Sequence, residues 1–368
     1  MVEGNFRIVK PTLVLDEPRA RRNLQRMASK AAAAGVHFRP HFKTFQAAVI
    51  GEWFRDGGIS ACTVSSLDMA EYFADHGWTD ITVAFPVNLR ELDLVNELAG
   101  RIELGLLVDT PAVLDVLENR LNHEVRVWVK IDAGYGRVGV WWEDHDSCRK
   151  IVAGIVGSRR LQFAGLLTHS GHSYHATDIA AIQEIHVETT ARLQGVRQDL
   201  AAAGFPDCLV SIGDTPTCSV VDDFSGSDEI RPGNFIFNDL MMESLGVCRD
   251  VDIAVAVACP VVGLYPRRKQ LVVHGGAVHF GKEFLPGSDG APVYGYLTTA
   301  SPDSLGRLDR QAVLVSLSQE HGVIQVPASY LDQVAVGDLV HVLPIHSCLT
   351  ANLYDSYLTL DGVRIPRR

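Results

Sequence analysis

Short apolar runs alternate with segments of helical periodicity from about residue 36 to about residue 245. The eight runs that we predict to be strands are residues 36–39, 60–64, 81–85, 103–108, 125–132, 161–169, 208–212 and 229–235. Helical periodicity is found before the first strand and between later ones, at 18–34, 67–76, 89–98, 111–121, 147–156 and 179–203. Eight alternating strands and helices predict an α/β fold, a (β/α)8 barrel, because an open doubly wound sheet usually has fewer strands.

The pattern changes at about residue 250. The β-like runs beyond this point are 252–262, 269–274, 293–298, 312–318, 338–343 and 357–360. Glycine and proline turns join them, and we expect no helix between them, which indicates a compact all-β domain. The run at 12–15 is expected to add a strand to this domain. The predicted organisation is therefore a barrel at 16–248 and a β-domain formed by 1–15 together with 249–368.

Composition argues against several classes of partner. The formal net charge is −11 and no basic block occurs, which argues against nucleic acid and against an anionic membrane surface. The first residues lack the apolar core of a signal peptide, and no apolar run is long enough to span a bilayer. The seven cysteines are scattered and never form CxxC, so we expect reduced thiols in a cytoplasmic protein, six of them in the core.

The active site of such a barrel lies at the carboxyl ends of its strands. Lys43, in the stretch RPHFKT, follows the first predicted strand. A lysine that is desolvated there has a lowered pKa and is a candidate to form a Schiff base with an aldehyde. Taken alone, a solvated surface lysine is the better interpretation.

The later loops change that balance. The loop after strand five, KIDAGYGRVGV, carries Arg137, which we expect to project a permanent cation inward. After strands seven and eight, the hydroxyls of Thr215 and Thr217 and the backbone N–H groups around Gly213 and Gly233 would suit a phosphate dianion. Taken alone, each loop is better interpreted as an ordinary turn. Together with the lysine they predict pyridoxal 5′-phosphate (PLP), an aldehyde that carries a phosphate.

These stretches, with THSGHSYH, SIGDTPT, RPGNFIFND and PIHSCLTANLYD, resemble the fold-type III PLP enzymes over about residues 11–361. Within these alanine-racemase-like barrels, the resemblance is to the D-serine dehydratase and D-threonine aldolase branch. It implies that Lys43 holds PLP as a Schiff base, that Arg137 points at the phenolic oxygen of PLP and that His169 packs against its pyridine ring. The remaining cofactor and phosphate contacts that it implies are Tyr174, Thr215, Gly233 and Asn234.

The chain departs from the family pattern at three positions. Phe45 and Gln46 replace the usual His-Lys after the lysine motif, and Leu167 stands where an aromatic residue is common. These departures affect the shape of the pocket and hence the substrate.

A metal site is predicted at His346 and Cys348. In an extended segment, residues two apart share a face, and imidazole with thiolate is a zinc-like pair. Alone, an HxC pattern is more often an ordinary core pair, but the family places a metal at this point. Two protein ligands would leave the metal open to water or substrate, as in catalytic sites, and a third ligand elsewhere stays possible. The histidines at 169, 172 and 175 lie on an irregular loop, so we favour cofactor packing over a metal for them.

The expected activity is β-elimination from a β-hydroxy D-amino acid, with D-serine giving pyruvate and ammonia. PLP would act as the electron sink, zinc would bind the hydroxyl, and Lys43 would remove the Cα proton. A D-threonine aldolase using Mn²⁺ or Mg²⁺, or a D-3-hydroxyaspartate dehydratase, is the main alternative. An alanine racemase has no use for HxC and ranks low. A non-catalytic PLP-binding protein and a barrel for another phosphate ligand are further alternatives. The family resemblance also implies the D configuration and a homodimer.

Overall fold

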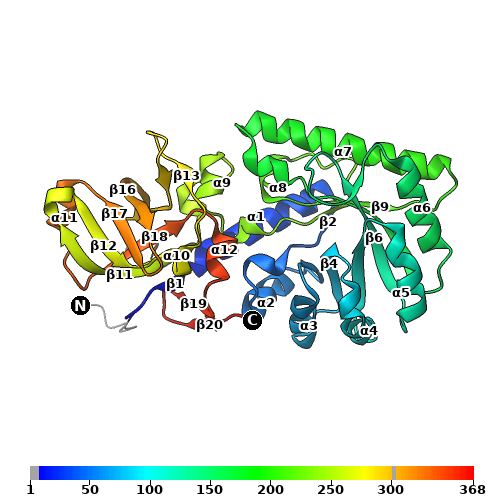
Figure 1. Ribbon diagram of the computed structural model, residues 1–368, viewed down its shortest axis with the longest axis horizontal. Coiled ribbons are helices and arrows are strands. Elements are labelled where there is room, and N and C mark those ends of the chain that lie inside the picture. The colour runs from blue at the N-terminus through cyan, green and yellow to red at the C-terminus, as the bar shows by residue number, and fades with distance from the viewer. Residues whose placement is uncertain (1–7, 301–303) are drawn as a thin grey trace. The chain divides into compact units, whose positions relative to one another are not determined.

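The structure is a computed structural model that describes residues 8–300 and 304–368. It divides into two compact units (Figure 1). The barrel unit is Arg26–Gly233, and the β unit consists of the residues up to Gln25 together with Asn234–Arg368. The predicted domain limits, 16–248 and 1–15 with 249–368, remain a prediction. Residues 1–7 of the second of these lie outside the described residues.

The barrel unit is built on eight parallel strands in the order β2-β10-β9-β8-β6-β5-β4-β3. Their bounds are β2 (His37–Phe38), β3 (Ala61–Val64), β4 (Asp80–Pro86), β5 (Glu103–Val108), β6 (Val125–Asp132), β8 (Leu161–Leu167), β9 (Leu209–Ile212) and β10 (Glu229–Ile230). A short strand, β7 (Val140–Trp141), pairs with the end of β6. The predicted α/β barrel is confirmed. Its eighth strand is shorter than expected, because the chain turns at Pro232 and Gly233 instead of continuing to Phe235.

The sheet is nearly closed by the segment that follows β2. On one side, the N–H of Arg39 donates to Ile230 O at 3.0 Å and that of His41 donates to Pro232 O at 2.9 Å. On the other side, the N–H of Thr63 donates to Pro40 O at 2.9 Å, and His41 and Thr63 form a parallel bridge. The residues that lead into Lys43 therefore join the first and last parts of the barrel sheet.

The helices of the barrel unit alternate with its strands and surround the sheet (Figure 1). They are α1 (Glu17–Ala34), which begins in the β unit, α2 (Ala48–Asp56), α3 (Leu67–Asp75), α4 (Leu92–Ala99), α5 (Leu114–Arg120), α6 (His145–Val156), α7 (Ile179–Ala202) and α8 (Thr215–Val220). The 3-10 turns of the chain are η1 (Phe42–Thr44), η2 (Leu89–Glu91), η3 (Pro111–Val113), η4 (Gly171–His175), η5 (Asn234–Ile236), η6 (Asp250–Asp252) and η7 (Pro266–Arg268). Among the described helices, none is both long and apolar enough to cross a membrane.

The β unit contains a nine-stranded sheet in the order β12-β17-β16-β15-β18-β11-β1-β19-β20, in which β11 also pairs with β12. The bounds are β1 (Thr12–Leu15), β11 (Val255–Tyr265), β12 (Gln270–His274), β15 (Gly295–Thr298), β16 (Leu308–Leu317), β17 (His321–Gln325), β18 (Leu339–Pro344), β19 (Ser356–Thr359) and β20 (Arg364–Pro366). A separate hairpin is formed by β13 (Leu285–Pro286) and β14 (Pro292–Val293). As predicted, 12–15 adds a strand, which pairs with β11 and β19.

The expectation of no helix in this part of the chain is wrong. The β unit contains the short helices α9 (Leu240–Ser244), α10 (Ala277–Phe280), α11 (Ala328–Leu331) and α12 (Ser347–Ala351). Each is little more than one turn, too short for a 3.6-residue periodicity to show in the sequence. All seven cysteines are free thiols; five are buried, whereas Cys248, expected in the core, is half-buried like Cys348.

A buried charge network ties the barrel strands together. The guanidinium of Arg39 donates to Glu229 at 2.6 Å and to Asp80 at 2.5 Å, and Asp80 also pairs with Arg126. Burial acts to raise the pKa of Glu229, but the hydrogen bond from His37 and the charges of Arg39 and its neighbours hold that pKa at about 2. The network therefore links β2, β10, β4 and β6 through ionised groups.

Replacing Glu229 should test the network. Glu229→Gln should cost about 3–5 kcal/mol, because it leaves Arg39 buried without its more deeply buried carboxylate partner. Because the folded pKa lies below the ordinary 4.5, the stabilisation by Glu229 should be complete above pH 4.5 and should fall as the pH drops toward 2. Urea unfolding at several pH values measures both effects. Glu103→Gln, which removes an exposed partner of Arg126, is the matched control and should cause a much smaller loss.

Candidate active site

The predicted lysine lies beyond the carboxyl end of β2, within the 3-10 turn η1. It is exposed, so the expectation of a desolvated amine at Lys43 is wrong. Residues three apart share a face of a 3-10 turn, and Phe42 and Phe45 occupy the buried face with ring centres 4.7 Å apart. Lys43 consequently projects from the other side of the turn.

Two histidines near this amine are kept neutral. Burial, then the charge of Lys43, lowers the pKa of His169 well below its ordinary value, and the same two causes act on His41. The Nδ1 of His169 lies 2.5 Å from Gly213 O, a carbonyl that can only accept, so this nitrogen carries the proton. The Nε2 of His169 is then left as a hydrogen-bond acceptor. A neutral ring in this position suits the predicted packing against PLP.

The desolvated lysine of the site is Lys130, at the end of β6. Its side chain is buried, its Nζ donates to Ile131 O at 2.8 Å, and burial with the charge of Arg231 lowers its pKa to about 7. Arg137, which was expected to project inward, is exposed, with its guanidinium 5.1 Å from the centre of the Tyr135 ring. Its charge still contributes to the lowered pKa of Lys130. Its charge also acts to lower the pKa of His169.

The loop after β9 begins the short helix α8. Asp214 accepts from the N–H and the hydroxyl of Thr217, both at 2.7 Å, so the predicted phosphate hydroxyl of Thr217 is already engaged as a donor. Burial raises the pKa of Asp214 to about 6, although these bonds and one from Ser173 oppose the rise. Tyr174 accepts from the N–H of Thr215 at 3.1 Å. The hydroxyl of Thr215 is buried and has no partner among the described residues.

The loop after β10 approaches η1 closely. A Cβ at Gly233 would lie 2.9 Å from the carbonyl oxygen of His41, so this backbone position requires glycine. The guanidinium of the preceding Arg231 is buried and donates to Ser211 Oγ at 2.8 Å and to Thr168 O at 2.6 Å. Its Nε–H has no partner within the described chain. Buried donors at Thr215 and Arg231 fit a ligand rich in acceptor atoms, as the phosphate and the ring of PLP are.

The predicted metal ligands belong to the β unit. The expectation that His346 and Cys348 lie in one extended segment is wrong, because β18 ends at Pro344 and α12 begins at Ser347. His346 directly precedes α12 and Cys348 is its second residue, so the two-residue repeat of a strand does not apply to them. Both side chains are half-buried.

A buried carboxylate anchors this turn. Asp239 Oδ2 lies 3.1 Å from His346 Nδ1 and accepts from Ser347 N at 2.9 Å and from Asn234 Nδ2 at 2.7 Å. Burial acts to raise the pKa of Asp239, but the hydrogen bond and charge of His346 and two backbone N–H groups hold it below its ordinary value. With Nδ1 donating to this carboxylate, Nε2 is the nitrogen left for a metal, the arrangement common around metal-bound histidines. The imidazole and the thiol thus fit a metal ion.

Asn234 serves this turn as well. Its side-chain carbonyl accepts from Ser347 Oγ at 2.6 Å while its amide donates to Asp239. In the structure Asn234 thus orients the residues next to the candidate metal ligands, in addition to its predicted role as a cofactor contact.

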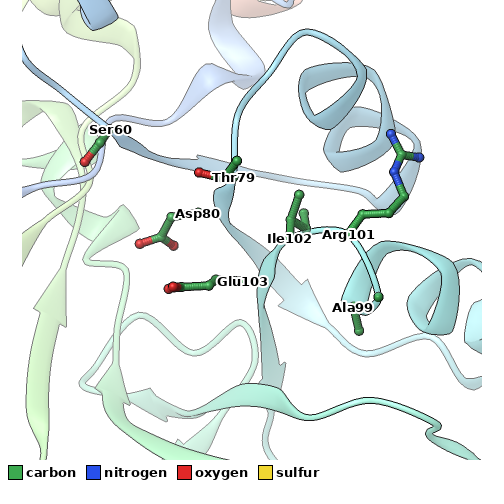
Figure 2. Close-up of a pocket in the computed structure, with 8 residues that line it drawn as sticks. Ser60, Thr79, Asp80, Ala99, Arg101, Ile102 and Glu103 are labelled. Carbon is green, nitrogen blue, oxygen red and sulfur yellow. The ribbon is translucent and has the colours of Figure 1, made fainter.

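A separate pocket opens at the other end of the barrel strands. Figure 2 shows its lining, which includes Asp80 and Glu103 at the starts of β4 and β5. Both carboxylates pair with Arg126. Because active sites of such barrels lie at the carboxyl ends of the strands, this pocket is not the candidate active site.

Comparisons with known proteins decide the family. Residues 15–240 match the family described as "Alanine racemase, N-terminal domain", and residues 254–360 match "Putative serine dehydratase domain". The chain belongs to the alanine-racemase-like D-serine dehydratase family. This confirms the predicted family, its barrel fold and the enzyme class, a PLP-dependent lyase.

Relatives of this alanine-racemase-like chain span nearly its whole length. D-threo-3-hydroxyaspartate dehydratase of Delftia sp. (strain HT23) is 30% identical over 363 residues, covering 96% of this chain and 94% of the relative. D-serine dehydratase of Dictyostelium discoideum is 29% identical over 380 residues, covering 95% and 92%. The solved structure of the Delftia enzyme superposes with a TM-score of 0.91, at 29% identity and 98% coverage of both chains.

The departures of this chain from the family pattern are absorbed by local packing. Phe45 is buried and stacks on Phe54 with ring centres 5.5 Å apart. Gln46 donates from Nε2 to the carbonyl oxygen of Lys43 at 3.0 Å, from a backbone conformation with φ of 45°. Leu167 packs in a buried cluster with Leu107 and Trp128. Through this packing and hydrogen bonding, the three residues therefore belong to the surroundings that hold the candidate site in place.

Sequence reasoning missed three residues of the site of this alanine-racemase-like chain. Lys130 and Arg231 stand inside stretches that carry the family resemblance, and Asp239 ends the stretch RPGNFIFND. A lysine within an apolar strand run was the one available signal for Lys130. Both hydrogen-bond partners of Arg231, and His346 and Ser347 among those of Asp239, come from distant parts of the chain, so spacing gives no sign of them.

The pH dependence of stability should reveal Lys130. Between pH 7 and 10.5 the unfolded lysine binds a proton that the folded one lacks, so the free energy of unfolding should rise with pH by up to about 1.4 kcal/mol per unit. In Lys130→Met this contribution is absent, and the difference between parent and variant should grow across that interval. Lys150→Met, at an exposed helical position, is the control. Identical pH slopes for the parent and Lys130→Met would contradict the prediction.

Proposed function

We propose that the chain is a PLP- and zinc-dependent D-serine dehydratase, which converts D-serine to pyruvate and ammonia. The observation that carries the proposal is the anchored pair of His346 and Cys348, whose Asp239 support is buried, in a chain that belongs to a PLP-dependent family. A thiolate favours zinc, whereas a carboxylate in its place would suit Mn²⁺ or Mg²⁺. A cysteine-to-alanine variant of a related D-threo-3-hydroxyaspartate dehydratase is described in the metal-free form, which implies a metal in that relative and supports a metal here.

The barrel residues would bind PLP and handle the proton. PLP, when bound, supplies an electron sink for a carbanion at Cα. Lys43 would bind the cofactor aldehyde and, once substrate has replaced it, take the Cα proton on its freed amine. The exposed side chain of Lys43 in η1 is accessible for that exchange. His169 would stay neutral against the ring, because its proton is held on Nδ1 by Gly213 O.

The β unit would supply the ligands of the metal ion. Zinc, when bound, acts as a Lewis acid that makes the β-hydroxyl of the substrate a better leaving group. His346 Nε2 and Cys348 Sγ would hold it, with water or substrate completing the shell. Asp239 would keep the imidazole oriented and increase its basicity as a ligand.

A second candidate function is D-threo-3-hydroxyaspartate dehydratase. The relative that carries this name is 30% identical to the chain. Its substrate has a second carboxylate, which calls for an additional cation. The exposed side chain of Arg137 carries the positive charge that this second carboxylate would require. The reaction is the same elimination, with oxaloacetate as the product.

Three substrates separate the candidates. Zinc-loaded enzyme is incubated with D-serine, D-threo-3-hydroxyaspartate or D-threonine, and the products are quantified. The proposal expects the highest kcat/KM for D-serine with pyruvate released. D-threonine reports the reaction type by itself, because elimination gives 2-oxobutanoate and aldol cleavage gives glycine. Glycine as the main product would replace the dehydratase by an aldolase.

Lys43→Ala should abolish both cofactor attachment and turnover. We expect the protein to lose the bound chromophore after dialysis and kcat to fall by on the order of 10³-fold or more, since the base is removed. Borohydride reduction followed by peptide mapping should mark Lys43 in the parent. Lys150→Ala, at an exposed position on α6, should behave as the parent. A Lys43→Ala enzyme with parental kcat would end the proposal.

Asp239→Asn should weaken zinc binding by about 10–100-fold without removing a ligand. The amide cannot accept from His346 with the charge of the carboxylate, so the imidazole loses its orientation. Competition with a chelator measures the affinity, while the absorption of bound PLP should persist. Asp252→Asn, at another buried aspartate of the β unit, is the matched control for general destabilisation. Equal zinc affinity in the two variants would be the contrary result.

The homodimer and the cytoplasmic location remain parts of the proposal. They are supported by the family resemblance and by the free thiols, respectively.

A further inference from the structure

A second group of potential metal ligands lies in the β unit. Within the part of the chain that the structure describes, His274, His279 and Glu320 form a set whose ligand atoms all lie within 4.8 Å of one another. Glu320 Oε2 is 3.5 Å from His274 Nε2 and 3.8 Å from His279 Nε2. Two imidazoles and one carboxylate are a ligand set suited to a borderline divalent cation.

The three ligands come from three segments held in fixed positions. His274 ends β12, His279 belongs to α10, and Glu320 lies in the turn between β16 and β17. The backbone joins these segments directly, because Gly275 N donates to Glu320 O at 2.9 Å and Ala277 N donates to Ser318 O at 2.8 Å.

Gly276 lies between those two bonds and makes the approach possible. A Cβ at this position would be 2.3 Å from Gln319 O and 2.4 Å from Ser318 O. Any other residue would force the α10 segment away from the β16–β17 turn. The backbone therefore brings the three side chains together before any ion is bound.

The spacing suits zinc. Ligand bonds of about 2.1 Å at tetrahedral angles place neighbouring donor atoms about 3.4 Å apart. The separations of 3.5 and 3.8 Å from Glu320 to the two imidazoles are close to that value. His279 Nδ1 accepts a hydrogen bond of 3.2 Å from Gly276 N, and ligation through Nε2 requires giving up this long bond so that Nδ1 can carry the proton.

We propose that His274, His279 and Glu320 bind a second zinc ion, with water as the fourth ligand. The ion would clamp the end of β12, α10 and the β16–β17 turn to one another. This site is separate from the pair His346 and Cys348, and it does not depend on the proposed function. The ion would hold three chain segments of the β unit together, and the water would leave one coordination position open.

Zinc stoichiometry tests the proposal in full-length, PLP-loaded enzyme. After stripping with a chelator, protein is dialysed against micromolar zinc and the bound metal is measured by mass spectrometry. The parent should hold two equivalents, and a variant with His346→Ala and Cys348→Ala should keep one. Adding His279→Ala to that variant should remove the remaining equivalent. Zinc should raise the thermal midpoint before this last change and not after it.

Two further variants keep the result interpretable. Glu320→Gln, at an exposed position, should fold as the parent and weaken the second zinc by at least about tenfold. His321→Ala removes the neighbouring histidine paired with His274 across the strands, and should retain the ion. The proposal is overturned if His279→Ala and Glu320→Gln bind zinc as tightly as the parent, or if His321→Ala loses it equally.

The outcome is distinguishable from that of the proposed function. Two bound zinc ions without dehydratase activity would contradict the proposed function alone. Dehydratase activity with a single bound zinc ion, which is lost when His346 and Cys348 are replaced, would contradict this inference alone.

Discussion

The barrel depends on one buried ion pair, between Arg39 and Glu229. Arg39 lies where the sheet closes, and its guanidinium reaches carboxylates of β10 and β4 while its backbone bonds to Ile230. Two charges at such depth are tolerated only when they are paired and hydrogen-bonded, so the strand positions are fixed together. The chain that leaves Arg39 is Pro40 to Lys43. The placement of Lys43, for which we propose attachment of the cofactor, is thus a consequence of how the barrel closes.

The local surroundings of Lys130 and Lys43 explain why the first is buried and the second is exposed. Lys130 comes from inside a strand, where Arg231 and burial leave no favourable place for a full positive charge. Lys43 comes from a turn whose buried positions are taken by aromatic rings. Exposure of Lys43 leaves its amine accessible to a ligand that enters from solvent, although it contradicts the expected desolvation.

How far the sequence predicts this structure depends on the range of the interactions involved. The bounds of β5 and β6 follow from runs rich in apolar residues and match the prediction. The early end of β10 follows from Pro232 and Gly233, which were visible but were read as part of a strand. A helix as short as α12 gives no visible periodicity in the sequence, so the pattern predicts an extended segment at Cys348 where the structure has a helix. Within the site, the engagement of Thr217 by Asp214 and of His346 by Asp239 depends on side-chain directions that spacing does not encode.

Histidine shows most clearly why neighbours, and not residue type, decide the chemistry. His169 donates a hydrogen bond from Nδ1 to a backbone carbonyl and lies near a lysine, so it is a neutral ring whose Nε2 is left as an acceptor. His346 donates the corresponding hydrogen bond to a buried carboxylate, which makes its other nitrogen a better metal ligand. Both residues follow strands and stand in motifs rich in polar residues. The two roles that we propose, a ring that packs against the cofactor and a zinc ligand, thus rest on Gly213 in one unit and on Asp239 in the other.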